Sequence, residues 1–331
     1  MRGRAQLRDG ISYQPLAEMG DCMTSGSSRV GPGALGDLWL VRGGRAGYRR
    51  RMDPLIRDGF ATYRMGEGPT VLVMPGPHRY ERPGLRCADA FHDHPVALGY
   101  QVVTFDPPGS GLSTRAAELS MEEMHACADE ALDAVGVAGP VDALGHSMAG
   151  LVLLAYALAR PERIARLVLV GTGTGGRAYM RARGALWNRS HPGFWGLAPL
   201  GILNMVLPTR APERLMNNYI ERRSFHDENL AEYDPVHLQD WGRAREGRPD
   251  WHWKVARYLD YRDRLDEIEV PCLVACGRDD PQFPPDCARE LAEGLPNSRL
   301  ICFAHSGHYP HIEEPAAFSE ALASFLDGTP A

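Results

Sequence analysis

A serine, Ser147, lies at the junction of a strand-like run and a helix-like run within residues 141–159. The pentapeptide around it, Gly-His-Ser-Met-Ala, is close to the nucleophile elbow G-x-S-x-G, in which a strand turns sharply into a helix. Such a turn requires small residues two positions on either side of the serine, and Gly145 and Ala149 are both small. A serine held there is a candidate nucleophile, and its other possible role is an ordinary helix N-cap.

A serine nucleophile also needs hydrogen-bond donors for the negative oxygen that forms when it attacks a carbonyl. The backbone N–H of Met148 begins the predicted helix, where the helix dipole favours negative charge. The loop after residues 70–74 reads Pro-Gly-Pro-His, and because proline has no N–H we assign the second donor to Gly76. A plain proline-rich turn is the alternative. We expect Pro77, His78 and His146 to contact substrate.

The general base is expected within residues 305–311, which read HSGHYPH. His308 follows the last predicted strand, where a loop at the carboxyl edge of a sheet begins, and we assign the base to it. His305 and His311 are competitors on spacing alone.

The acid that orients this base is expected after the preceding strand, where the chain carries Asp279 and Asp280. An aspartate before Pro281 is also typical of a turn. The order serine, aspartate, histidine is the one used by one of the known triad architectures.

The elements that must position these residues alternate between strand-like and helix-like runs, which predicts a mostly parallel sheet with helices on both faces. We expect strands at 60–63, 70–74, 101–105, 141–144, 164–170, 271–276 and 299–303. We expect helices at 87–98, 121–135, 147–159, 286–293 and 316–326. Ser120 and Glu123 form a capping box at the start of one of them.

Three regions follow from this pattern. Residues 1–51 are rich in arginine, glycine and serine, and we interpret them as a poorly ordered extension upstream of a natural start at Met52. Residues 52–174 and 267–331 are expected to form the α/β core. Residues 175–266 carry no strand-like run, and we expect them to form an inserted helical cap. We expect Trp187 and Trp195 of this cap to contact substrate, and packing of the cap onto the core is the alternative.

Composition excludes several other classes of protein. The formal net charge of -6 and the pI near 6.1 lack the basic footprint of a nucleic-acid binder. No apolar run approaches the roughly 20 residues that span a bilayer, and no signal peptide is evident, so we expect a cytoplasmic protein without a membrane partner. The seven cysteines form no CxxC pair, and we expect Cys272 and Cys276 to be small buried hydrophobes.

A metal site is not expected at the one cluster that suggests one, His92-Asp93-His94. These residues are consecutive, and a helix there would point the two histidines in different directions. We therefore expect neither a metal nor another cofactor.

Taken together, the stretches VLVMPGP, FDPPGSGLS, GHSMAG, VPCLVACGRDDPQFPP and SGHYPHIEEP resemble the α/β-hydrolase fold family over about residues 55–331. The resemblance implies Ser147 as nucleophile, His308 as base and, three residues after Gly277, Asp280 as acid. Within the family the chain looks most like proline iminopeptidases and related hydrolases. It lacks the His-Gly-Gly-Pro-Gly loop and the Gly-Gly-Ser-Trp-Gly elbow of those peptidases.

The resemblance implies acyl transfer to water without a cofactor. Our first hypothesis is a hydrolase of an ester, lactone or related acyl bond in a hydrophobic small molecule. The second is an aminopeptidase, which would need cap carboxylates to bind a free α-amine; the candidates are Glu213, Glu221, Asp227 and Glu228. The third is a non-hydrolytic protein that keeps the pocket for ligand binding.

Overall fold

The computed structural model describes residues 54–76, 86–115, 120–176, 178–207, 209–232 and 259–328. The predicted extension 1–51 lies outside these residues, as do Pro77 and His78. The centre is an eight-stranded sheet in the order β1-β2-β4-β3-β5-β6-β7-β8. Its strands are β1 (Leu55–Arg57), β2 (Phe60–Met65), β3 (Thr70–Val73), β4 (Gln101–Phe105), β5 (Val141–His146), β6 (Ile164–Val170), β7 (Cys272–Gly277) and β8 (Ser298–Phe303). Only the pairings of β1 with β2 and of β2 with β4 are antiparallel, which confirms the predicted mostly parallel sheet.

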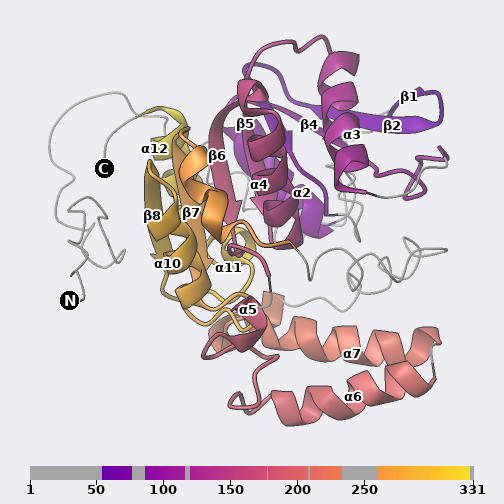
Figure 1. Cartoon of the computed structure of the whole chain (residues 1–331), viewed down its shortest axis with the longest axis vertical. Coiled ribbons are helices and arrows are strands. Elements are labelled where there is room, and N and C mark those ends of the chain that lie inside the picture. The colour runs from indigo at the N-terminus through magenta and orange to yellow at the C-terminus, as the bar shows by residue number, and fades with distance from the viewer. Residues whose placement is uncertain are drawn as a thin grey trace, which may run out of the picture.

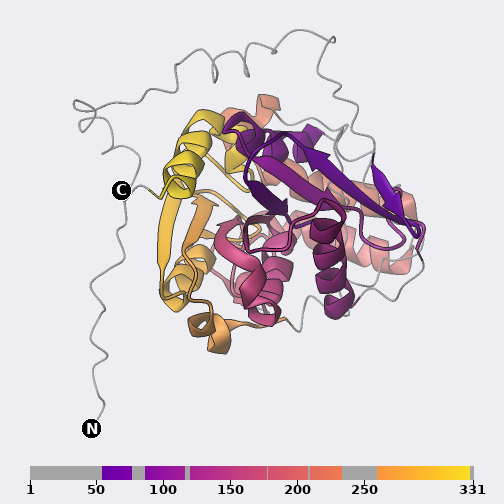
Figure 2. The same cartoon turned by 90° about the horizontal axis from the view of Figure 1, so that it is seen from above.

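Helices cover both faces of this sheet (Figures 1 and 2). The core helices are α2 (Arg86–Ala97), α3 (Met121–Ala134), α4 (Met148–Ala159), α10 (Pro285–Gly294), α11 (Pro310–Glu313) and α12 (Pro315–Leu326), with short 3-10 turns η2 (Pro161–Arg163) and η5 (Arg262–Glu267). Residues of α3, α4 and α10 pack in one apolar cluster, and residues of α2 and α12 pack in the other. The sheet therefore lies between two hydrophobic layers.

The strands supply both layers because successive side chains point to opposite faces. On β6, Leu167 and Leu169 belong to the first cluster, whereas Val168 and Val170 belong to the second. Cys272 and Cys276 are each 1% exposed within the first cluster, as predicted for small buried hydrophobes. A strand segment buried on both faces must be apolar, and β6 is apolar and buried from Leu167 to Val170.

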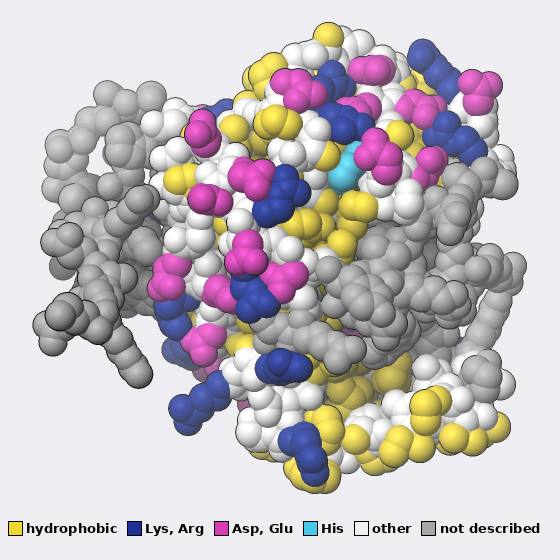
Figure 3. All heavy atoms as spheres, in the orientation of Figure 1, with side chains coloured by type: hydrophobic (Ala, Val, Ile, Leu, Met, Phe, Trp, Pro, Cys, Tyr) yellow, Lys and Arg dark blue, Asp and Glu magenta, His cyan; other side chains and the backbone are white. Residues whose placement is uncertain are grey.

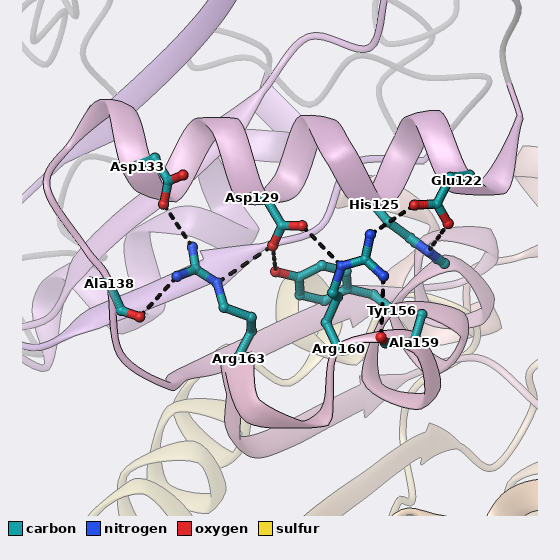
Figure 4. Close-up of polar contacts among 9 residues, drawn as sticks. All are labelled: Glu122, His125, Asp129, Asp133, Ala138, Tyr156, Ala159, Arg160 and Arg163. Carbon is teal, nitrogen blue, oxygen red and sulfur yellow. Dashed lines mark hydrogen bonds and ion pairs between the residues drawn. The ribbon is translucent and has the colours of Figure 1, made fainter.

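A polar network joins α3 to the end of α4, the helix that follows Ser147 (Figure 4). Asp129 of α3 accepts a hydrogen bond of 2.7 Å from the Tyr156 hydroxyl and contacts the guanidinium groups of Arg160 and Arg163. Ser120 accepts a hydrogen bond from the Glu123 N–H at 3.1 Å, which confirms the predicted cap of α3. The network fixes α4 against its neighbour at the end remote from the serine.

The chain leaves the core after β6 and returns before β7. Tyr261 N–H donates to the Thr174 carbonyl at 2.9 Å, which joins the two ends of the insertion. Between them the structure describes α5 (Ala178–Arg181), α6 (Phe194–Val206), α7 (Arg210–Arg223) and η3 (Asp227–Glu232). Tyr261 and Leu265, which we expected within the insertion, pack instead into the first core cluster.

Figure 1 shows α6 and α7 side by side as a hairpin below the core, with α5 between the hairpin and the sheet. Leu186, Leu197 and Ile220 form a small apolar cluster inside this cap. None of the helices described has both the length and the apolar character needed to cross a bilayer.

Candidate active site

The turn between β5 and α4 has the strained backbone of a nucleophile elbow. Ser147 has φ +57°, in the left-handed region that non-glycine residues rarely adopt. Its N–H donates to the Val170 carbonyl at 2.8 Å, which holds the elbow against β6. The side chain makes no capping hydrogen bond to α4, so the hydroxyl does not serve as an ordinary N-cap.

The elbow also explains why alanine is accepted at position 149. A Cβ on Gly145 would lie 2.9 Å from the Cα of Gly150, and a Cβ on Gly150 would lie 2.7 Å from the Thr172 side chain. These distances are too short for real Cβ atoms. The helix-side position that requires glycine is therefore 150, whereas position 149 requires only a small residue, as alanine is.

A buried histidine and aspartate lie together at the same edge of the sheet. His308 Nδ1 is 2.8 Å from Asp280 Oδ2, and both side chains are fully buried. The other carboxylate oxygen of Asp280 accepts the backbone N–H groups of Gln282 at 2.7 Å and Phe283 at 3.0 Å. His308 Nε2 is buried and has no hydrogen-bond partner among the described residues, so it can accept a proton from a nucleophile.

The competing residues have other partners. Asp279 is half exposed, with its carboxylate 3.1 Å from His226 Nε2. His305 is exposed and contacts Glu228 at 3.2 Å. Asp280 and His308 are the pair that the structure brings into contact.

The base and the serine border two consecutive residues at the end of β6. Ser147 is hydrogen-bonded to Val170, and a Cβ on the next residue, Gly171, would lie 3.2 Å from His308 Nδ1. Gly171 has φ +53°, and its missing side chain lets the imidazole approach this closely. The nucleophile and the base therefore converge at the carboxyl ends of β5 and β6.

His146 lies beneath the base, where we had expected a substrate contact. Its Nε2 is 2.8 Å from the His308 carbonyl oxygen, and the two rings are 4.6 Å apart between centroids. The side chain is 5% exposed and packs against Tyr309 and His311. This position makes His146 a support for the loop that carries the base.

The base loop is also held by Glu313, which our sequence reasoning missed. Its carboxylate accepts the backbone N–H groups of Gly307 at 2.9 Å and Tyr309 at 3.1 Å, on either side of the base. It also accepts the N–H of His226, a cap residue, at 2.7 Å. Burial raises the pKa of Glu313, while these donors act to lower it. The only signal of this role in the sequence was a carboxylate five residues after the base. It lies in a charged run of the kind that is usually exposed to solvent.

A second link ties the cap to the base loop. The His308 N–H donates to the carbonyl of Ser224, just after α7, at 2.6 Å. The Tyr309 hydroxyl donates to Glu221 of α7, and Phe225 stacks on the Tyr309 ring. The end of α7 is therefore part of the frame that positions the base.

The two predicted oxyanion donors lie at the same edge. The Met74 N–H donates to the Leu144 carbonyl at 2.9 Å and so continues the pairing of β3 with β5 toward the elbow. Gly76, two residues later, is buried, and so is Met148 at the first position of α4. The backbone N–H groups of these two residues remain our predicted oxyanion hole.

Residues 71–321 match the model of the alpha/beta hydrolase family. The chain belongs to the α/β-hydrolase family. A 2-hydroxy-6-oxononadienedioate/2-hydroxy-6-oxononatrienedioate hydrolase of Cupriavidus pinatubonensis is 31% identical over 250 residues, which cover 70% of this chain and 78% of that one. The Escherichia coli protein of the same name is 27% identical, with the same coverage.

Solved structures share the fold of this α/β-hydrolase. An alpha/beta fold family hydrolase from Bacillus anthracis has a TM-score of 0.68 at 21% identity, covering 82% of this chain and 97% of that one. An enol-lactonase from Burkholderia xenovorans has a TM-score of 0.62 at 18% identity, covering 83% of this chain and all of that one. At these identities the likeness extends to the fold alone.

Aromatic side chains of the hydrolase pack beside His308, where the core meets the cap. Phe283 stacks on the His308 ring with 12° between the planes, and Tyr179 of the cap stacks on Phe283 at 4.8 Å. Trp187 packs against both the first core cluster and the cap cluster, and its Nε1 is buried without a partner among the described residues. Trp195 lies on the outer surface of the cap, 62% exposed, which does not fit the substrate contact predicted for it.

Two groups of side chains could suggest a metal. Ligand atoms of His226, Glu228 and His305 lie within 4.8 Å of one another, but the histidines already contact Asp279 and Glu228. We interpret this group as a polar bridge between the cap and the base loop. In the run His92-Asp93-His94, where we expected no metal site, one ring nitrogen of His94 contacts Ser319 and the other contacts the His311 carbonyl.

Proposed function

We propose that this α/β-hydrolase is a serine hydrolase that cleaves an ester, lactone or related acyl bond of a small, largely apolar molecule. The observation that carries the proposal is the fully buried His308 and Asp280 pair beside the strained Ser147. A polar, hydrogen-bonded pair held in the interior next to a strained serine has an energetic cost, and catalysis accounts for its presence.

The proposed reaction proceeds through an acyl-enzyme. Ser147 Oγ attacks the carbonyl carbon while His308 Nε2 accepts its proton. Asp280 keeps the other ring proton on Nδ1, so that Nε2 is the nitrogen free to act as base. The imidazolium then protonates the leaving group, and a water molecule repeats the cycle on the acyl group. The N–H groups of Gly76 and Met148 stabilise the negative oxygen in both halves.

The proposed substrate has an apolar body with a polar group near one end. Phe283 and Tyr179 offer flat apolar surfaces beside the base. The buried indole N–H of Trp187 lacks a partner, and such a donor is costly unless a ligand or water accepts its hydrogen bond. We propose that a substrate oxygen accepts from Trp187.

A second candidate is hydrolysis of a carbon–carbon bond next to a ketone. The relatives at 31% identity are hydrolases of 6-oxo dienedioates, in which the electrophile is also a carbonyl carbon. The same serine and base would act: once the dienol has tautomerised to its keto form, attack on the ketone expels the neighbouring carbon as a stabilised dienolate, which is then protonated. The aminopeptidase alternative is less favoured, because Glu221 and Glu228 contact Tyr309 and His305.

A substrate panel tests the proposal. The wild-type enzyme is assayed on an aryl ester, a lactone, a 2-hydroxy-6-oxo dienoate and a proline arylamide, beside Ser147→Ala and the control Ser190→Ala. Ser190 is an exposed cap serine. We expect ester or lactone turnover to fall by at least about 10³-fold in Ser147→Ala only. Faster turnover of the dienoate would select the second candidate, and equal turnover by Ser147→Ala would overturn both.

A further inference from the structure

The cap helix α6 exposes apolar side chains, whereas a helix at the surface of a soluble protein normally exposes polar ones. Its 13 residues, FWGLAPLGILNMV, include no charged side chain, yet Leu197 is the only buried residue among them. A helix that is apolar all round is normally buried within a core or a membrane. The cap leaves this one at the molecular surface.

The exposed residues of α6 follow one face of the helix. Trp195, Pro199, Ile202 and Val206 are separated by four, three and four positions, the spacing of a single helical stripe. Trp195 is 62%, Ile202 59% and Val206 67% exposed. With the neighbouring exposed apolar residues this stripe forms what we call the apolar ridge: Trp195, Pro199, Ile202, Leu203, Met205, Val206, Leu207 and Leu215.

Figure 3 shows hydrophobic side chains gathered over the hairpin at the bottom of the molecule. At the end of the ridge away from Trp195, three consecutive apolar residues are exposed. Met205 is 76% exposed, and the next two residues are both more than half exposed. A continuous exposed apolar surface of this kind is characteristic of a site that binds a membrane or another protein.

The segment that carries the ridge is positively charged, which favours an anionic partner. Residues 177–223 contain eight arginines, two glutamates, no lysine and no aspartate, which gives a formal charge of +6 in a chain whose total is -6. The exposed arginines include Arg181, Arg183, Arg189, Arg214 and Arg222. Arg189 lies over the Trp195 ring at 5.9 Å, so the positive charge reaches the ridge itself.

We propose that the apolar ridge docks the enzyme on the surface of an anionic lipid bilayer. Apolar side chains beside arginines are the pattern of helices that lie in the plane of the membrane interface. At 13 residues α6 is too short to span a bilayer, which needs about 20. A second copy of the chain is the less favoured occupant, because it would bring two surfaces of +6 together. This inference goes beyond the proposed function, and binding is measured without a substrate.

The test is co-sedimentation of the full chain with vesicles. One set contains phosphatidylcholine with phosphatidylglycerol, and the other contains phosphatidylcholine alone. We expect the wild type to bind the anionic vesicles and to be released as salt screens the arginines. We expect Ile202→Glu and Val206→Glu each to lower the partition coefficient at least about tenfold, because a carboxylate is repelled from this interface. Arg214→Gln should lower it about fivefold on anionic vesicles only.

The matched control is Ile56→Glu, which places the same charge on an exposed isoleucine of β1, outside the cap. We expect its partition coefficient to equal that of the wild type, and all variants to keep the wild-type thermal midpoint. The proposal is overturned if the wild type does not bind anionic vesicles, or if Ile202→Glu binds as the wild type does. Light scattering that shows a dimer, dissociated by Ile202→Glu, would assign the ridge to a second copy instead.

Discussion

The loop that carries the base and the hairpin of the cap place their side chains in opposite ways. In the loop, polar groups are inside and partnered: His308 and Asp280 contact each other, and Glu313 accepts three backbone N–H groups. In the hairpin, apolar groups such as Met205 and Val206 are outside. The first arrangement is complete within the chain, whereas the second exposes a surface that water does not favour. The proposed chemistry therefore depends on contacts within the chain, whereas the hairpin presents an apolar surface that suits a partner outside the molecule.

The two neighbouring aspartates give the largest expected effect. Asp280→Asn removes the carboxylate that fixes the imidazole tautomer, and we expect turnover to fall by about 10³- to 10⁴-fold. Asp279→Asn alters a half-exposed side chain, and we expect turnover within about threefold of the wild type. Steady-state kinetics on the best substrate of the panel measures both. A similar loss of turnover in Asp279→Asn would show that burial and contact with His308 do not determine which aspartate is the catalytic acid.

The elbow gives a smaller effect, on stability. Gly150→Ala places a Cβ about where the Thr172 side chain lies, and we expect the free energy of unfolding to fall by about 3 kcal/mol. Ala149→Gly adds only helix flexibility, at a cost of about 1 kcal/mol. Urea titrations measure both. A loss for Gly150→Ala no larger than that for Ala149→Gly would show that position 150 does not require glycine.

The pH dependence of stability tests the buried histidines of the core. Burial lowers the pKa of His92 to about 3 and that of His94 to about 4, from the usual 6.5. As the pH falls below 6.5, the unfolded chain binds protons that the folded chain cannot, so the folded state loses about 1.4 kcal/mol per pH unit per histidine. This loss continues until the pH reaches the folded pKa.

Urea titrations between pH 6.5 and 4.5 measure this slope. We expect His92→Phe to remove the part of this slope that His92 contributes. An unchanged slope in His92→Phe would show that this histidine binds a proton in the folded state.

The smallest effect is expected on the outer face of the cap. Trp195→Ala removes a side chain that is 62% exposed, and we expect the free energy of unfolding to change by no more than about 0.5 kcal/mol. Turnover of a soluble substrate should also stay at the wild-type value. Thermal unfolding and the ester assay check both. A fall of several kcal/mol would mean that the ridge is structural, which removes the contrast between the loop and the hairpin.

Sequence alone predicted the elements that have strong periodicity or strong local signals. The extent of β6 agrees with the predicted strand at both ends, and Ser120 caps α3 as its spacing indicated. Contacts between residues distant in sequence were not predictable in this way. Position 150 requires glycine because Thr172, which follows β6, lies against it. The role of Glu313 depends on the path of the base loop. The position of His146 depends on the same loop.

The cap was the least predictable part. Its tryptophans suggested substrate contact, but the composition of a helix does not say which face meets the core. Trp187 lies between core and cap, whereas Trp195 faces outward. The periodicity of α6 identifies an apolar stripe, but it does not show whether that stripe is exposed or buried.

The most direct test of the central claim is covalent labelling of the serine. The wild-type protein is treated with a fluorophosphonate, which reacts with activated serine hydroxyls, and the adduct is located by peptide mass spectrometry. We predict a single adduct on Ser147, lost in Ser147→Ala and formed at least about 10³-fold more slowly in His308→Ala. An unlabelled Ser147, or an adduct on another serine with Ser147 intact, would contradict the account.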